Sequence, residues 1–141
     1  SNVFLTQFHG RKRVFLFAPD QSTLLYRLPF NVHSTVDVDN PDYEAYPGLK
    51  YVRGMSTIME HGDTLFMPSG YWHHIEYLEG GFALAVRTIA HSLPMKLGGV
   101  WNLTVQRTTD NVMRKLNDEK WFNYKRKVAY RRAEKAIKQF A

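Results

Sequence analysis

The chain has 141 residues, of which 44% are hydrophobic and 14% aromatic, and its formal net charge is +6 at pH 7. This composition is typical of one well-packed globular domain with a small appendage, and it excludes a disordered chain. Cysteine is absent, which excludes disulfides and thiolate metal sites, so any metal must be bound by His, Asp, Glu or water. No apolar run approaches the roughly 20 residues that span a bilayer, and no signal-peptide pattern is present. We therefore expect a cytoplasmic protein without a membrane partner.

The positive charge is confined to the C-terminal part of the chain. Residues 114–141 carry ten Lys and Arg against three Asp and Glu, a net charge of +7. Residues 1–113 carry nine basic and ten acidic residues, a net charge of −1. Such an asymmetry indicates a change of role along the chain.

The first predicted elements are two buried strands over residues 3–8 and 14–17, joined by a hairpin at Gly10. The basic triplet that follows Gly10 is either a solvated turn or a source of one inward-pointing cation. Strand alternation places Lys12 and Val14 on one face, and Arg11 and Arg13 on the other.

Residues 20–50 are rich in turn-forming residues and show no clear hydrophobic periodicity. A stretch of this length is uncommon in a compact domain unless it has a role, such as covering a site. Two interpretations of His33, Asp37 and Asp39 are open. They are metal ligands, or the acidic residues bond their own backbone in Asx turns, which is the more frequent use.

Three further strands are predicted over residues 51–60, 64–67 and 71–78, with turns at Gly62-Asp63 and Pro68-Ser69-Gly70. Alternation in the last of these strands places His73 and Trp72 on opposite faces, and His74 on the face of Trp72. A histidine directly after a rigid turn suits a metal ligand. Alternatively, the histidine pair is simply part of a β-hairpin, as most histidines in strands are.

A sixth strand, over residues 82–89, is apolar except for Arg87. An isolated arginine in such a strand requires an anionic partner, unless it lies at a sheet edge with its guanidinium in water.

From Val100 the apolar period becomes helical, with Thr108 or Thr109 placed to cap a first helix. Asn117-Asp118 interrupts it, and Asp118 is expected to cap a second helix over about residues 119–139. Two apolar stripes run along the second helix, and a dimer interface accounts for them better than packing on the chain's own sheet.

Strands joined mostly by hairpins, without βαβ alternation, predict an antiparallel sandwich or jelly roll. The segments that carry a family resemblance are residues 10–21, residues 36–44 and the Gly62-Asp63 to Glu76 hairpin. Together they resemble the JmjC and cupin-like Fe(II)- and 2-oxoglutarate-dependent oxygenases, and most closely the subgroup containing the asparaginyl hydroxylase factor inhibiting HIF. The resemblance implies a mainly β, double-stranded β-helix, incomplete at its N-terminus, over residues 1–93. It also implies a helical dimerisation region over residues 94–141.

The family binds Fe(II) through a His-x-Asp motif and a distal His, with open positions for 2-oxoglutarate. The resemblance implies that His73 is this distal ligand and that Lys12 pairs with the distal carboxylate of 2-oxoglutarate. Arg87 is an alternative anion contact, and no catalytic residue is assigned. Judged from its usual distance to the lysine at the position of Lys12, the family's His-x-Asp motif is expected upstream of Ser1. Two of the three protein ligands are therefore expected outside this chain.

Two functions are therefore open. The chain is the C-terminal part of an Fe(II)- and 2-oxoglutarate-dependent dioxygenase, inactive when isolated and acting on a protein or small-molecule substrate. Alternatively, it is a non-catalytic cupin-like binding module that dimerises through its helices. A nucleic-acid partner for the basic tail is not favoured, because Trp121, Phe122 and Tyr124 fit apolar helix stripes better than a stacking surface.

Overall fold

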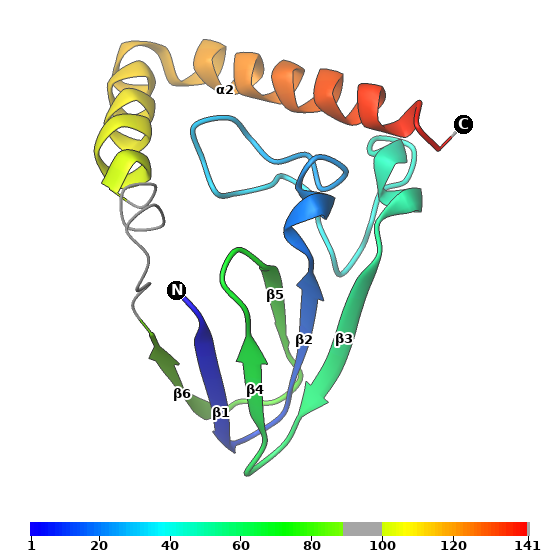
Figure 1. Ribbon diagram of the computed structural model, residues 1–141, viewed down its shortest axis with the longest axis vertical. Helices are drawn as coiled ribbons and strands as arrows, with labels where there is room; N and C mark the ends of the chain where they lie inside the picture. Colours follow the sequence, from blue (N-terminus) through cyan, green and yellow to red (C-terminus); the bar gives the residue numbers. More distant parts are fainter. Residues whose placement is uncertain (89–99, 141) are drawn as a thin grey trace. The chain divides into compact units, whose positions relative to one another are not determined.

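A computed structural model describes residues 1–88 and 100–140 of the chain, which form two compact units (Figure 1). Unit 1 comprises Ser1–Asp20 and Arg53–Ala90, and unit 2 comprises Gln21–Val52 and His91–Ala141. All six strands lie in unit 1, and the long helix lies in unit 2. In this division, residues 21–52 group with the helical part.

Unit 1 consists of two three-stranded antiparallel sheets. The strands are β1 (Val3–His9), β2 (Lys12–Phe17), β3 (Gly54–Met59), β4 (Thr64–Met67), β5 (Trp72–Tyr77) and β6 (Phe82–Arg87). The order is β4-β1-β6 in one sheet and β3-β2-β5 in the other, so consecutive strands often cross between sheets (Figure 1). This arrangement confirms the predicted mainly β jelly roll with a helical appendage. The strand predicted over residues 51–60 begins only at Gly54, because Pro47–Tyr51 forms the 3₁₀ turn η2.

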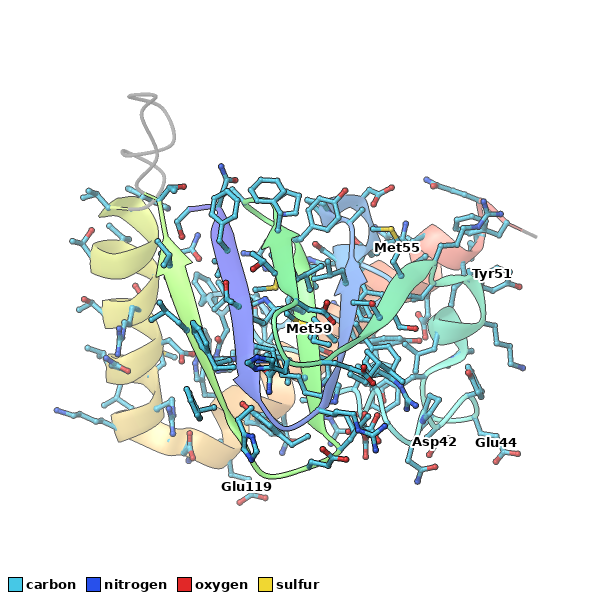
Figure 2. The ribbon with its side chains drawn as sticks, turned by 90° about the horizontal axis from the view of Figure 1, so that it is seen from below. Asp42, Glu44, Tyr51, Met55, Met59 and Glu119 are labelled. Carbon is cyan, nitrogen blue, oxygen red and sulfur yellow. The ribbon has the colours of Figure 1, made fainter. Side chains whose placement is uncertain are left out.

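The core of unit 1 is built from alternate residues of the central strands. Leu5 of β1 and Val14 and Leu16 of β2 are buried, and Met59 of β3 and Met67 of β4 complete the cluster. In Figure 2, Met59 lies among the strands of this unit. In β1 and β2, alternate residues thus point towards this core and away from it.

Two glycine turns close one end of unit 1. Gly10, which joins β1 to β2, has a φ of +72°, a conformation that other residues rarely adopt. A Cβ atom on Gly81, in the turn before β6, would lie 1.9 Å from the carbonyl oxygen of His9. Only glycines allow these two turns to approach so closely.

Unit 2 is built on α2 (Arg107–Ile137), which follows the π-helical segment η3 (Asn102–Gln106). Ala129 and Ala133 of the helix are buried against Tyr26 and Leu28 of the segment 21–52. The hydroxyl oxygen of Tyr26 accepts a hydrogen bond from the backbone N–H of Gly48 at 3.0 Å. The aperiodic segment therefore supplies the partners for one of the apolar stripes that the sequence assigned to a dimer interface.

The predicted helix break lies at Asn117, whose φ of −162° and ψ of 95° interrupt α2. The cap is not the predicted Asp118, however. The side-chain oxygen of Asn117 accepts the backbone N–H of Lys120 at 2.9 Å, whereas Asp118 forms an ion pair with Arg114 at 3.1 Å. Asn117 is the residue that leaves the helical conformation, and its side chain is therefore the one placed to cap the next turn.

The predicted cap at Thr108 or Thr109 is also wrong. The helix already runs through η3, and the Thr109 hydroxyl donates to the carbonyl of Val105, one turn earlier, at 2.8 Å. Threonine can satisfy its hydroxyl in this way within a helix. No helix among residues 1–88 and 100–140 is long and apolar enough to cross a membrane.

Candidate functional site

The candidate site residues Lys12 and His73 lie on neighbouring strands of unit 1. In the register of β2 and β5, Lys12 is opposite Tyr77, Val14 is opposite Ile75, and Leu16 is opposite His73. Side chains of directly opposed residues point to the same face of a sheet. His73 and Lys12 therefore share the face that carries the core residues Val14 and Leu16. They are separated by four residues along the ladder, about 13 Å.

Lys12 is a buried cation. Its side chain is on the core-facing side of β2, and the residue is only 3% exposed. Burial lowers the pKa of its ammonium below the ordinary lysine value. Within the described parts of the chain, no carboxylate forms an ion pair with it, unlike Arg13, which pairs with Glu76 at 2.8 Å on the other face. A buried lysine without a counter-charge is an unfavourable arrangement that an anionic ligand would relieve.

His73 is exposed near the start of β5, one residue after Trp72. The turn that precedes this strand contains Gly70, whose φ of +86° fixes the direction in which the chain enters β5. His73 is thus exposed on the face on which Lys12 is buried, towards the other end of the β2–β5 pair.

His74 lies on the opposite face, as the alternation of the strand requires. It is opposite Phe15 of β2, and the two rings are 5.9 Å apart between centroids. His74 contributes to packing on the outer face of this sheet, and the two histidines do not form a joint ligand pair.

Arg87 is the last residue of β6, an edge strand of its sheet within the described part of the chain. Arg87 is opposite Val3 of β1, and Val3 is also opposite Met67 of β4. Met67 is the last residue of β4 and directly precedes the turn that leads to β5 and His73. Arg87 therefore lies at the same end of unit 1 as His73. The side chain is exposed and has no ion-pair partner among residues 1–88 and 100–140, which agrees with the edge interpretation and leaves the guanidinium available to an anion.

Gln7 is a buried polar residue that the sequence reasoning missed. It is 3% exposed on the core-facing side of β1, and its amide nitrogen donates to the carbonyl oxygens of His9 and Gly10 at 2.6 and 3.1 Å. Its Oε1 atom has no hydrogen-bond partner within residues 1–88 and 100–140. The sequence feature that could have revealed it is a single amide side chain at an inward-facing position of the apolar run 3–8. Gln7 holds the β1–β2 turn in place and leaves one acceptor free in the same interior as Lys12.

These residues fit an anionic organic ligand better than they fit a metal ion alone. Among the residues that the structure describes, no group of three His, Asp or Glu side chains could bind a metal. Of the alternative ligands in the loop, Asp37 is already engaged in a turn. The Asp37 carboxylate accepts the backbone N–H groups of Asp39 and Asn40 at 3.0 and 3.2 Å, as expected for an Asx turn.

Comparisons with known proteins identify the family of this chain. Residues 1–89 match the family described as "Cupin-like domain". The chain belongs to the cupin-like domain family. JmjC-domain relatives place it in the wider JmjC and cupin-like family of oxygenases, which generally depends on Fe(II) and 2-oxoglutarate.

Three relatives illustrate the match. JmjC domain-containing protein D of Dictyostelium discoideum is 38% identical over 86 residues, 57% of this chain and 19% of that protein. The tRNA wybutosine-synthesizing protein 5 of Gallus gallus is 41% identical over 83 residues, 59% of this chain and 26% of that protein. HSPB1-associated protein 1 of Mus musculus is 36% identical over 78 residues, 52% and 16% of the two chains. The cupin-like chain thus spans about a fifth of the length of these relatives.

Proposed function

We propose that the chain is the C-terminal part of the catalytic domain of an Fe(II)- and 2-oxoglutarate-dependent hydroxylase. The single observation that carries this proposal is Lys12, a buried cation without a counter-charge in the described chain, on the same sheet face as His73. Lys12 binds the distal carboxylate of 2-oxoglutarate, because a buried ammonium gains most from a carboxylate in a low-dielectric interior.

His73 provides one of the protein ligands of the metal. When bound, Fe(II) and 2-oxoglutarate supply the oxidising chemistry that hydroxylates a C–H bond. The residues of this chain bind and orient the acid: Lys12 fixes its far end, while the surrounding apolar core excludes water from it. Arg87, which lies at the same end of unit 1 as His73, contacts a second anionic group. The other metal ligands belong to residues outside this chain, so the isolated chain is inactive.

The test is turnover of 2-oxoglutarate to succinate in the presence of Fe(II). The 141-residue chain and the same chain extended upstream by its natural sequence are assayed side by side. We expect no turnover by the chain alone and turnover by the extended protein. Turnover by the chain alone at the rate of the extended protein would show that the ligand assignment is wrong.

The alternative is a non-catalytic cupin-like module, which the absence of a three-ligand cluster in the described residues favours. It predicts that the extended protein contains no metal after purification and does not bind 2-oxoglutarate. The name of one relative concerns tRNA, so RNA joins proteins and small molecules among the substrate classes for the proposed enzyme.

We further propose that the protein is a homodimer that associates through the first half of its helical region. Trp101, Val105 and Val112 recur at helical spacing there, and they are 59%, 41% and 50% exposed. This apolar stripe has no cover among the described residues, whereas the stripe of Ala129 and Ala133 is buried inside unit 2. A second copy would remove the exposed stripe from water.

A further inference from the structure

The second half of α2 carries a straight row of cations. Lys120, Lys127, Arg131 and Lys138, here called the basic stripe, follow the kink at spacings of seven, four and seven residues. Because 18 residues complete five helical turns, the first and last of these cations lie on the same side of the helix. At 1.5 Å per residue, the stripe is about 27 Å long.

The basic stripe faces away from the buried side of the helix. Arg131 is two residues from both Ala129 and Ala133, which are 2% and 0% exposed. Two residues correspond to about 200° around a helix, so Arg131 points opposite to this buried seam. All four stripe residues are exposed, and Lys135 is exposed beside them.

The stripe cations have no internal partners. No ion pair within the described chain involves any of them, in contrast to Arg114, which pairs with Asp118, and Lys125, which pairs with Asp110. Only two carboxylates occur in this half of the helix after Asp118, those of Glu119 and Glu134. The charge of the stripe is therefore available to an external anion.

An aromatic groove adjoins the start of the basic stripe. Lys120 lines it together with Trp121 and Tyr124, whose rings are stacked 5.4 Å apart at an angle of 16°. Phe30, from the segment 21–52, lies across from Trp121 with its ring centroid 5.5 Å away. The groove has a volume of about 630 Å³, and Tyr124 is 52% exposed. It therefore offers flat aromatic surface beside a track of positive charge.

We propose that the basic stripe and this groove form an RNA-binding surface, with the stripe along the phosphates and an unpaired base in the groove. A row of cations binds the phosphate backbone, and aromatic rings beside it stack on unpaired bases, which folded RNA presents next to its helices. A membrane surface fits less well, because interfacial helices carry apolar residues along the whole row of their cations. The apolar residues beside this stripe are instead gathered in the groove at its first end, where Lys120 lies.

The sequence-based argument against nucleic acid rested on aromatic residues that belong to apolar stripes. The structure leaves Tyr124 52% exposed in the groove beside Lys120, so membership of an apolar stripe does not prevent this ring from stacking on a base. The proposal concerns unit 2 and involves neither Lys12 nor His73. RNA binding can therefore fail or succeed independently of the proposed hydroxylase.

The test is binding of the full chain to a fluorescently labelled RNA hairpin with an unpaired loop, measured by anisotropy between about 50 and 200 mM salt. Lys127→Gln combined with Arg131→Gln neutralises the middle of the basic stripe. The matched control, Lys50→Gln combined with Lys115→Gln, removes the same charge from exposed lysines elsewhere in unit 2. We expect the stripe variant to lose about tenfold or more in affinity and its log–log salt slope to fall by between about one and two. The control should bind within about threefold of the parent chain.

Tyr124→Ala tests the groove. It should weaken binding to the looped hairpin by about tenfold and leave binding to a fully paired RNA duplex unchanged, because only unpaired bases can stack on the ring. Equal losses for the stripe and control variants would overturn the proposal. It would also be overturned by a parent chain that prefers anionic lipid vesicles or an acidic peptide to the RNA.

Discussion

The Nζ atom of Lys125 lies 2.6 Å from Oδ1 of Asp110, and the two side chains are only 4% and 9% exposed. The same oxygen accepts a hydrogen bond from Nε1 of Trp121 at 2.8 Å. Asp110 precedes the kink at Asn117, whereas Trp121 and Lys125 follow it. This buried group therefore joins the two halves of α2 and determines the angle between them.

Asp110→Ala is expected to lower the free energy of unfolding by about 3–5 kcal/mol, because it leaves the buried ammonium of Lys125 without a partner. The matched control is Arg114→Ala, which removes an ion pair that is 56% and 68% exposed in the same helix. This control should cost less than about 1 kcal/mol. Chemical denaturation measures both, and similar losses for the two variants would contradict the role of the buried pair.

The same carboxylate makes stability depend on pH. Burial alone would raise the pKa of Asp110, but the hydrogen bonds from Lys125 and Trp121 lower it by more than burial raises it. The folded-state pKa therefore lies below the ordinary value of 3.8. The unfolded chain therefore binds the proton first, and the stabilisation is present above about pH 4 and is lost as pH falls through the folded-state pKa. The parent chain and Asp110→Asn are denatured at several pH values between about pH 6 and pH 3. The difference between their free energies of unfolding should become smaller as the pH falls. A constant difference would contradict this.

The sequence predicted the strands well because their apolar alternation is local. The placement of Lys12 with Val14 on one face, and of His73 opposite His74, follows directly from the two-residue period of a strand. The helix break at Asn117-Asp118 was also visible, because both residues are poor helix formers.

Features that depend on distant partners could not be predicted in this way. The pair of Arg114 and Asp118 has the local i,i+4 spacing of a helix. Nothing local shows that Lys125 is paired with Asp110, because the two residues lie on either side of the kink at Asn117. The same limit explains why Ala129 and Ala133 were assigned to a dimer interface. Their partners, Tyr26 and Leu28, come from a segment without periodicity, about 100 residues earlier. Gln7 was missed because a single amide in an apolar run is informative only once its burial is known.

Lys12→Met should stabilise the isolated chain. The buried ammonium has no counter-charge in the described residues, and burial lowers its pKa, so an apolar side chain of similar length removes an unfavourable charge. We expect the free energy of unfolding to rise by about 1–2 kcal/mol. Lys50→Met, at an exposed position, is the control and should change it by less than about 0.5 kcal/mol. Urea denaturation measures the effect, and destabilisation by Lys12→Met would mean that the lysine is satisfied in the folded chain.

The homodimer is tested at the exposed stripe of the first helical half. Val105→Glu combined with Val112→Glu places two charges in the proposed interface, so the dimer should dissociate at least about tenfold more readily. Tyr43→Glu, at an exposed loop position, is the control and should leave the molecular mass unchanged. Light scattering coupled to size-exclusion chromatography gives the mass of each variant. A parent chain that is monomeric at high concentration, or a dimer that survives both glutamates, would exclude this interface.

The two adjacent histidines provide a matched pair for the proposed metal site. In the chain extended upstream, His73→Ala removes an exposed side chain on the face of Lys12, whereas His74→Ala removes one that packs against Phe15 on the other face. If His73 is a metal ligand, its loss should reduce succinate formation by about 100-fold or more while stability changes by less than about 1 kcal/mol.

His74→Ala should show the reverse pattern, with activity retained within about threefold and some loss of stability from the missing ring contact. Iron content after purification provides a readout that does not depend on activity, and it should fall in His73→Ala alone. Equal effects of the two variants on turnover and on iron content would show that neither histidine is a ligand. The two residues are neighbours in sequence but lie on opposite faces of the strand. A difference between the two variants therefore reports the face that each side chain occupies.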